Sequence, residues 1–266
     1  MNKFYIQTAL FLLSIFAYGN NETLAAEPAP GEDTKPQLRS RYPTSEEIYE
    51  KNKHLSCRGR NHTPVIKIMN EAVKQLEYYA TSKDGYEVYA QSPNDSISYY
   101  VKKIDDETSI LKVHLNIYAS SQYNDIINRL WDPNSPNFFN KGPARVAHVY
   151  NPNLLQILQV CTKDSKHYQK YFCALASKAE ISKDKTIIAM TSSNTSDRSH
   201  SHIEYENPIL KNTYTFWDSI YPKEYSTNEK YKRVHVNLAG YLIEKKGDDL
   251  EITYIESVSD IPILIS

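Results

Sequence analysis

The chain has 266 residues, of which 40% are hydrophobic, so it is long enough to bury a sizeable core within one large domain. Lys and Arg number 31 and Asp and Glu number 32, and the resulting net charge of −1 argues against a protein that binds nucleic acid through a basic surface. With 7 Gly and 22 Tyr, the composition favours strands and argues against a fold built on glycine-rich nucleotide loops.

The N-terminal residues 1–26 are typical of a secretory signal peptide. Lys3 precedes an apolar run at 9–18, and two alanines just before Glu27 offer a cleavage site. The run is shorter than the ~20 apolar residues that a spanning helix needs, so a cleaved signal is favoured, with an uncleaved anchor as the alternative. We expect a disordered, Pro-rich linker at 27–43 and one folded domain at 44–266.

The first half of the domain is predicted to hold two helices and then three strands. Thr44 and Glu47 form a capping-box pattern that starts a short helix over 45–54. A longer helix spans 64–80, because its apolar residues recur at steps of three and four. This stripe consists of Ile66, Met69, Val73, Leu76 and Ala80. The strands are predicted at 86–89, 96–103 and 110–118. In the last strand Val113, Leu115 and Ile117 alternate with Lys112, His114 and Asn116, which predicts one buried and one wet face.

The second half is predicted to hold one helix and then six strands. The helix spans 122–131 and carries its apolar residues on one face, namely Tyr123, Ile126, Ile127, Leu130 and Trp131. Strands are predicted at 144–150, 154–162, 168–181, 186–191, 233–244 and 250–257. A long polar segment at 192–230 is of a length that is usually functional or mobile. Helices segregated from a run of antiparallel strands indicate an α+β domain, and a curved sheet covered by a helix commonly encloses an apolar cavity.

The three cysteines are Cys57, Cys161 and Cys173, and an odd number leaves at least one of them without an intrachain bridge. Cys161 and Cys173 lie on adjacent predicted strands. A disulfide between them requires Cα atoms within about 7 Å, which spacing alone does not decide.

Several long motifs point to a family. They are the leader MNKFYIQTALFLLSIFAYGNNETLAAEPAPGEDTKP, then YPTSEEIYEKNKHL, MNEAVKQLEYYATSKDGYE, IINRLWDPNSPNFFN, ARVAHVYNPNLLQ and NLAGYLIEKKGDDLEITYIES. Together they resemble the Fam-a (PYST-A) multigene family of rodent malaria parasites over nearly the whole chain. That family is related to START domains, the steroidogenic-acute-regulatory-related lipid transfer fold.

The resemblance implies a helix-grip fold, in which a curved antiparallel sheet grips a C-terminal helix over a lipid cavity. It implies binding and transfer of a phospholipid of the phosphatidylcholine class, by a monomer that contacts membranes transiently. It also implies secretion, with export into the host red cell. The sequence departs from the family pattern after Pro262, where only Ile263–Ser266 follow. We therefore expect a START-like domain without the C-terminal lid helix.

Candidate ligand-binding residues follow from alternation along the strands and from the resemblance. They are Trp131, Ala147, Val149, Tyr171, Ile188, Asn237, Ala239, Tyr241, Ile252 and Tyr254. Asn237 and Tyr241 are candidates for fixing a headgroup or glycerol oxygen. A gate that opens at a membrane is predicted in the long polar segment, with Ile209, Leu210, Phe216 and Trp217 as its candidate residues.

Enzyme signatures are weak. His200, His202 and Glu204 alternate as three metal ligands would on a strand, but their polar flanks favour a solvated loop. There is no nucleophile elbow and no phosphate-binding loop in the sequence. We expect no enzymatic activity, no metal and no cofactor. The main alternative function is a secreted or exported interaction protein with a vestigial pocket, and a metal hydrolase is a second, weaker one.

Overall fold

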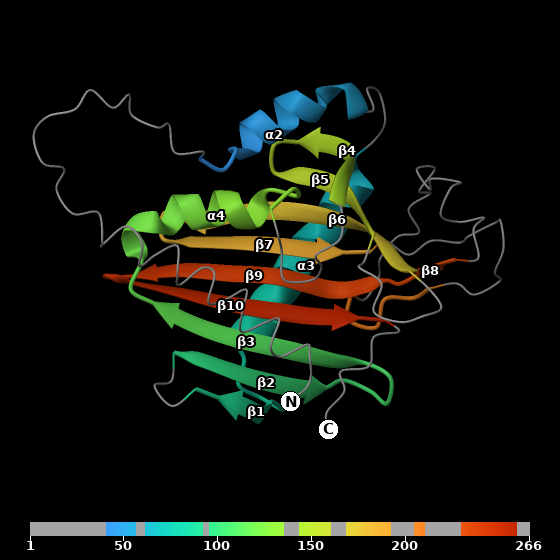
Figure 1. Cartoon of the computed structure of the whole chain (residues 1–266). Coiled ribbons are helices and arrows are strands. Elements are labelled where there is room, and N and C mark those ends of the chain that lie inside the picture. The colour runs from blue at the N-terminus through green and yellow to red at the C-terminus, as the bar shows by residue number, and fades with distance from the viewer. Residues whose placement is uncertain are drawn as a thin grey trace, which may run out of the picture.

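The computed structural model describes residues 41–56, 62–92, 96–135, 144–160, 169–192, 205–210 and 230–259 (Figure 1). These residues form one ten-stranded sheet with a few helices packed on it. The strand order is β1-β2-β3-β10-β9-β7-β6-β5-β4, and all neighbours in it are antiparallel. The remaining strand, β8, pairs in parallel with β6. The predicted α+β class and its large curved antiparallel sheet are confirmed.

The helices lie where the sequence predicts them. Thr44 and Glu47 form both hydrogen bonds of the capping box at the start of α2. No helix in the described ranges is long and apolar enough to cross a bilayer. The helices are α2 (Ser45–Asn52), the 3₁₀ turn η1 (Lys53–Leu55), α3 (Thr63–Thr81), the 3₁₀ turn η2 (Ser120–Gln122) and α4 (Tyr123–Trp131).

The strands also match the prediction, with one addition. The strand predicted over 233–244 corresponds to β9. A short strand that was not predicted, β8, precedes it and pairs with β6. The strands are β1 (Glu87–Gln91), β2 (Ile97–Lys103), β3 (Ser109–Ile117), β4 (Ala144–Asn151), β5 (Leu154–Val160), β6 (Gln169–Ser182), β7 (Lys185–Thr191), β8 (Tyr231–Arg233), β9 (Val236–Lys246) and β10 (Asp249–Val258).

The sheet is buried on both faces at its centre. In Figure 1, α3 runs diagonally behind β7, β9 and β10, while α4 lies on the opposite side. We call the side that packs against α3 the α3 face and the side that carries α4 the α4 face. Alternate residues of β9 contribute to each: Leu238 and Leu242 to the α3 face, and Tyr241 and Ile243 to the α4 face.

The buried stripe of α3 is rotated from the predicted one. Met69, Leu76 and Ala80 are buried as expected, but Ile66 is 43% exposed. Val65, Ile68 and Ala72 are buried instead. The predicted and the observed stripe share three residues. An apolar helix face is wide enough to contain either stripe, so periodicity alone could not decide between them. Packing against the sheet determines which of the two stripes is buried.

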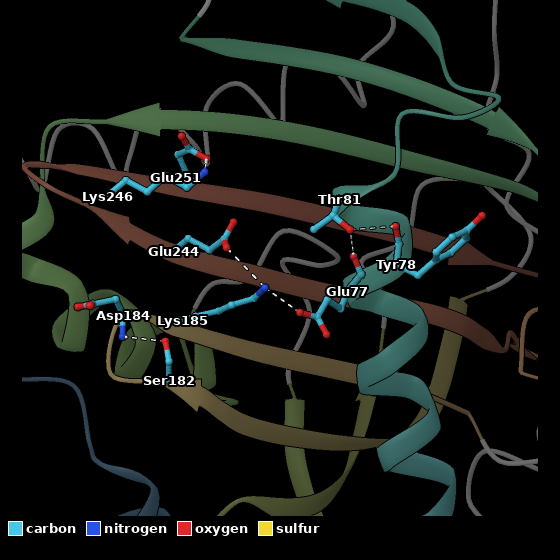
Figure 2. A network of polar contacts seen from close by, with 9 residues as sticks. All are labelled: Glu77, Tyr78, Thr81, Ser182, Asp184, Lys185, Glu244, Lys246 and Glu251. Carbon is cyan, nitrogen blue, oxygen red and sulfur yellow. Dashed lines mark hydrogen bonds and ion pairs between the residues drawn. The ribbon is translucent and has the colours of Figure 1, made fainter.

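The C-terminal half of α3 is held to the sheet by an ion pair as well as by apolar packing. The Lys185 Nζ on β7 lies 2.7 Å from Glu77 Oε1 on α3 and 3.6 Å from Glu244 Oε1 on β9 (Figure 2). The hydrogen bond from Lys185 to Glu77 raises the lysine pKa above its usual value. The three side chains are only partly exposed, so this network is less screened by solvent than an isolated surface pair.

Lys112 on β3 is the exception to the predicted wet face of that strand. The residue is 7% exposed, because the C-terminal end of α3 lies over it. Its Nζ donates to the carbonyl oxygen of Ser82 at 2.6 Å and lies within hydrogen-bonding distance of two carbonyls in the last turn of α3. It also lies 4.0 Å from the centroid of the Tyr86 ring. Carbonyls at a helix C-terminus carry partial negative charge, so the lysine caps α3 from the sheet.

We expect Lys112→Met to lower the free energy of unfolding by ~2 kcal/mol, because it leaves buried carbonyl acceptors without their donor. Chemical denaturation monitored by circular dichroism measures this. Lys103→Met is the matched control: Lys103 pairs with Asp106 on the surface and should change stability by no more than ~0.5 kcal/mol. Equal effects of the two substitutions would contradict the capping role.

Gly240 on β9 sits where α3 comes nearest to the sheet. Its φ is +142°, and a Cβ placed there would lie 1.9 Å from the Ile188 carbonyl oxygen and 2.8 Å from Leu76 Cδ1. The first of these is backbone of the neighbouring strand and cannot rotate away. Glycine at this position therefore allows β7, β9 and α3 to pack together.

Gly240→Ala should destabilise the domain by at least ~3 kcal/mol, since both the steric overlap and the backbone angle oppose any side chain. Gly247→Ala provides the control. Gly247 also has a positive φ, but a Cβ there would meet no atom within 4 Å, so only the ~1 kcal/mol of backbone strain is expected. Thermal unfolding of both variants separates the two effects, and comparable losses would show that close packing at Gly240 is unimportant.

Candidate ligand-binding face

The α4 face carries a continuous apolar surface that extends across eight strands from β2 to β4. Its centre is formed by β10 and β9, where Tyr254 lies opposite Tyr241 and Ile252 lies opposite Ile243. The side chains of α4 pack against one end of this surface, where the Tyr123 hydroxyl lies 2.9 Å from Thr186 Oγ1 on β7. The two helices thus cover the sheet unequally, because α3 is a long helix of 19 residues and α4 has 9.

Most of the predicted ligand-binding residues meet on this face. They come from one helix and from strands far apart in sequence, and all are buried. Their assignment to a ligand stays a prediction, but the structure brings them to one surface. They are Trp131, Val149, Ile188, Ala239, Tyr241, Ile252 and Tyr254.

Three predicted residues lie elsewhere. Tyr171 and Ala147 belong to a separate small cluster beside β5 and β6. Asn237 sits at a bulge in β9, where the register with β10 shifts. Its amide is engaged with protein groups: Oδ1 accepts from the Tyr205 hydroxyl at 2.7 Å, and Nδ2 donates to Ser257 Oγ at 3.1 Å. These bonds occupy the amide that was predicted to fix a ligand oxygen.

The described gate candidates, Ile209 and Leu210, pack on the α3 face. Asn207 holds them there, because its Oδ1 accepts hydrogen bonds from both of their backbone N–H groups and its Nδ2 donates to the Asn237 carbonyl. The other two candidates, Phe216 and Trp217, lie outside the described residues, as do His200, His202 and Glu204 and the cysteines Cys57 and Cys161. The predicted gate and the Cys161–Cys173 bridge therefore stay predictions.

Sequence reasoning missed Glu256, which is 7% exposed and lies on the α4 face. On β10 it follows Ile252 and Tyr254 at a spacing of two, and its neighbours across the sheet are Leu111 on β3 and Ala239 on β9. The signal was present in the sequence, because period-two alternation places residue 256 with 252 and 254. A glutamate near a strand end is ordinarily assumed to face water, and that assumption hid it.

The environment of Glu256 favours its neutral form. Burial raises the pKa of this carboxyl to about 7, and the neighbouring Tyr254 hydroxyl offsets only part of the rise. Within the described residues no cation pairs with it, and its Oε2 lies within hydrogen-bonding distance of no donor there. Burial likewise raises the pKa of Tyr254 well above its usual value.

Three aromatic residues, Tyr241, Tyr254 and Trp131, add polar atoms to this face. The rings of Tyr241 and Tyr254 lie 5.1 Å apart, tilted by 43°, in the middle of the apolar surface. Trp131 at the end of α4 is 4% exposed, and its indole Nε1 has no hydrogen-bond acceptor among the described residues. A buried indole N–H and a buried carboxyl oxygen without partners are groups for which a bound molecule can supply the missing bonds.

Comparison with known proteins identifies solved structures with a similar fold. The sequence matches no known protein-family profile, and no curated protein matches it significantly. Among solved structures, human StAR-related lipid transfer protein 5 superposes with a TM-score of 0.51 at 10% identity, covering 74% of this chain and 82% of that one. The chain has the START-like helix-grip fold.

Two other solved structures are similar at lower scores. Human STARD10 has a TM-score of 0.46 at 13% identity, covering 72% of this chain and 68% of that chain. The STAR-related lipid transfer protein fragment from Xanthomonas axonopodis has a TM-score of 0.45 at 9% identity, covering 66% and 81%. At these identities the likeness concerns the fold alone.

No set of three or more metal-binding side chains comes together in the described part of this START-like fold. The buried polar groups of the α4 face are instead scattered single groups on an apolar surface. Such an arrangement can hold and orient an apolar molecule with a few oxygens.

Glu256→Gln tests whether the carboxyl is neutral. A pKa raised on folding means that the folded protein holds the proton while the unfolded chain has lost it, so stability falls as pH rises from ~4.3 to about 7. We expect the variant to match the wild type near pH 4.5 and to be more stable at pH 8, as measured by urea denaturation.

Glu251→Gln is the control on the same strand. Glu251 pairs with Lys246 on the other face at 2.6 Å, so its removal should lower stability slightly and should give no gain at pH 8. If the wild type gained stability relative to Glu256→Gln between pH 4.5 and 8, the carboxyl would be ionised and paired.

Proposed function

We propose that this protein binds a phospholipid on the α4 face and transfers it between membranes, with phosphatidylcholine as the most suitable class. The observation that carries the proposal is the second apolar surface of the sheet. It contains buried polar atoms at Trp131 and Glu256 that have no hydrogen-bond partner among the described residues. The START-like fold supports it, since the similar human structure is named as a lipid transfer protein.

Burial of acyl chains supplies the driving force for such binding. Each CH₂ group removed from water contributes ~0.8 kcal/mol, so two long chains need an apolar surface that spans many side chains. The α4 face supplies this across β3, β10, β9, β7, β6 and β5. Binding and release require no bond to form or break, so the proposed role is that of a carrier and not an enzyme.

The setting of this activity is also proposed. The leader at 1–26 and the long motifs shared with the Fam-a family support secretion by a rodent malaria parasite, with export into the host red cell. In that setting the protein acts as a monomer that contacts membranes transiently. The balanced charge of the chain is consistent with contact that does not depend on a strong electrostatic field.

A tryptophan experiment tests whether lipid occupies the α4 face. The chain has two tryptophans, so Trp217→Phe leaves Trp131 as the only one. After incubation with vesicles of brominated phosphatidylcholine and separation from them, we expect the Trp131 fluorescence to be quenched, since bromine quenches only nearby indoles. Mass spectrometry of the same sample should find one phospholipid per protein.

The control places the reporter on the other face. In a triple variant, Tyr79→Trp is combined with Trp131→Phe and Trp217→Phe. Its single tryptophan then packs against the α3-face cluster, and its fluorescence should not be quenched by the brominated lipid. Bound lipid that quenched only this second reporter would contradict the assignment of the face. A protein that carried no lipid and did not move fluorescent phosphatidylcholine between vesicles would support the alternative function, an interaction protein with a vestigial pocket.

A further inference from the structure

We propose that Glu256 is a specificity-determining contact for the ligand: its protonated carboxyl donates a hydrogen bond to an uncharged oxygen of the lipid, an ester carbonyl or a glycerol hydroxyl. Uptake is therefore coupled to pH and is stronger in mildly acidic solution. The inference rests on the proposed function, because it assumes that lipid lies on the α4 face.

Glu256 is buried on the α4 face, within the surface proposed to hold the ligand. Both cross-strand neighbours, Leu111 and Ala239, are apolar and belong to the α4-face cluster. Ala239 is small, and the next residue of β9 on this face is Tyr241. The carboxyl is thus a polar group placed within the apolar surface, near the opposite end of the strands from the contact between Tyr123 and Thr186.

The other groups facing it do not supply a positive charge. From its own strand there is Tyr254, and from β9 there is Tyr241, whose ring lies 5.1 Å from that of Tyr254. From β3 there is Leu111. Among the described residues the only buried Lys or Arg is Lys112, and it lies on the α3 face, where α3 carbonyls surround it.

This environment decides between two modes of ligand binding. An ionised carboxylate would attract a cationic headgroup, but a lone charge in an apolar setting is strongly disfavoured. A neutral acid has a proton to donate. The Tyr254 hydroxyl neighbours the carboxyl, but Oε2 has no hydrogen-bond partner among the described residues, so an acceptor for a proton on Oε2 must come from outside them. Lipid ester and hydroxyl oxygens are acceptors that stay uncharged at every pH in question. We therefore infer the neutral mode.

The coupling to pH follows from the population of the protonated form. If lipid binds only that form, the apparent affinity scales with its fraction. With a pKa near 7, as burial produces here, the protonated fraction falls about tenfold between pH 6 and pH 8. Phosphatidylcholine itself does not titrate over this range, so a change in affinity reports on the protein.

The test measures binding of fluorescent phosphatidylcholine, and of diacylglycerol with the same chains, to the full chain at pH 6 and pH 8. We expect the wild type to bind both lipids about tenfold more weakly at pH 8. Glu256→Gln, which has a permanent N–H donor in the same place, should bind equally at both values and near the wild-type level at pH 6. Glu251→Gln should retain the wild-type dependence on pH.

The outcomes separate this inference from the proposed function. Tighter wild-type binding at pH 8, or a dependence on pH seen with phosphatidylcholine but not with diacylglycerol, would assign the contact to the headgroup and overturn the inference. Equal dependence of binding on pH in the wild type and in Glu256→Gln would also overturn the inference, although lipid binding would still be established. If no lipid bound at either pH, the proposed function would fail, and the stability of Glu256→Gln would still report whether the carboxyl is neutral.

Discussion

The packing of α3 against the centre of the sheet is the contact on which the rest of this structure depends. The central strands are apolar on both faces, so both faces must be covered to keep them from water. Gly240 makes this possible, because any side chain at that position would collide with the backbone of β7 and with Leu76. With α3 seated, the Glu77–Lys185–Glu244 network and the capping by Lys112 fix its C-terminal half. The α4 face is then the surface that remains.

Each face buries one ionisable group, and burial shifts the pKa of both toward the neutral form. Lys112 on the α3 face donates to helix carbonyls and lies over an aromatic ring, while burial lowers its pKa to about 8. Glu256 on the α4 face has only the neighbouring Tyr254 hydroxyl to offset part of its burial, and burial raises its pKa. The hydrogen bonds of Lys112 explain its burial by its role in the fold. A buried polar atom without a hydrogen-bond partner, such as Oε2 of Glu256, is better explained by a bound ligand that supplies the partner.

Much of the fold could be predicted from the sequence, because helix and strand periodicities are local. The capping box, the period of α3 and the alternation in β3 each involve residues that are close in the chain. Lys112 could not be placed, since its carbonyl partners lie 30 or more residues away. Asn237 was assigned to the ligand because simple alternation does not reveal a bulge, and Ile209 and Leu210 because their partner helix is far away in sequence. The candidate face was largely predictable, and its single buried acid was not.

The connection between β7 and β9 is attached to the sheet at several described positions, which bears on how the fold tolerates substitutions there. At its start Ser192 bonds to Val236 and to the Cys173 carbonyl, and at its end Val234 bonds to Tyr171. Between these points Asn207 anchors a third position to the sheet. Three described positions of this connection are thus held to the sheet by separate hydrogen bonds, so the loss of one of these bonds leaves the other two anchors in place.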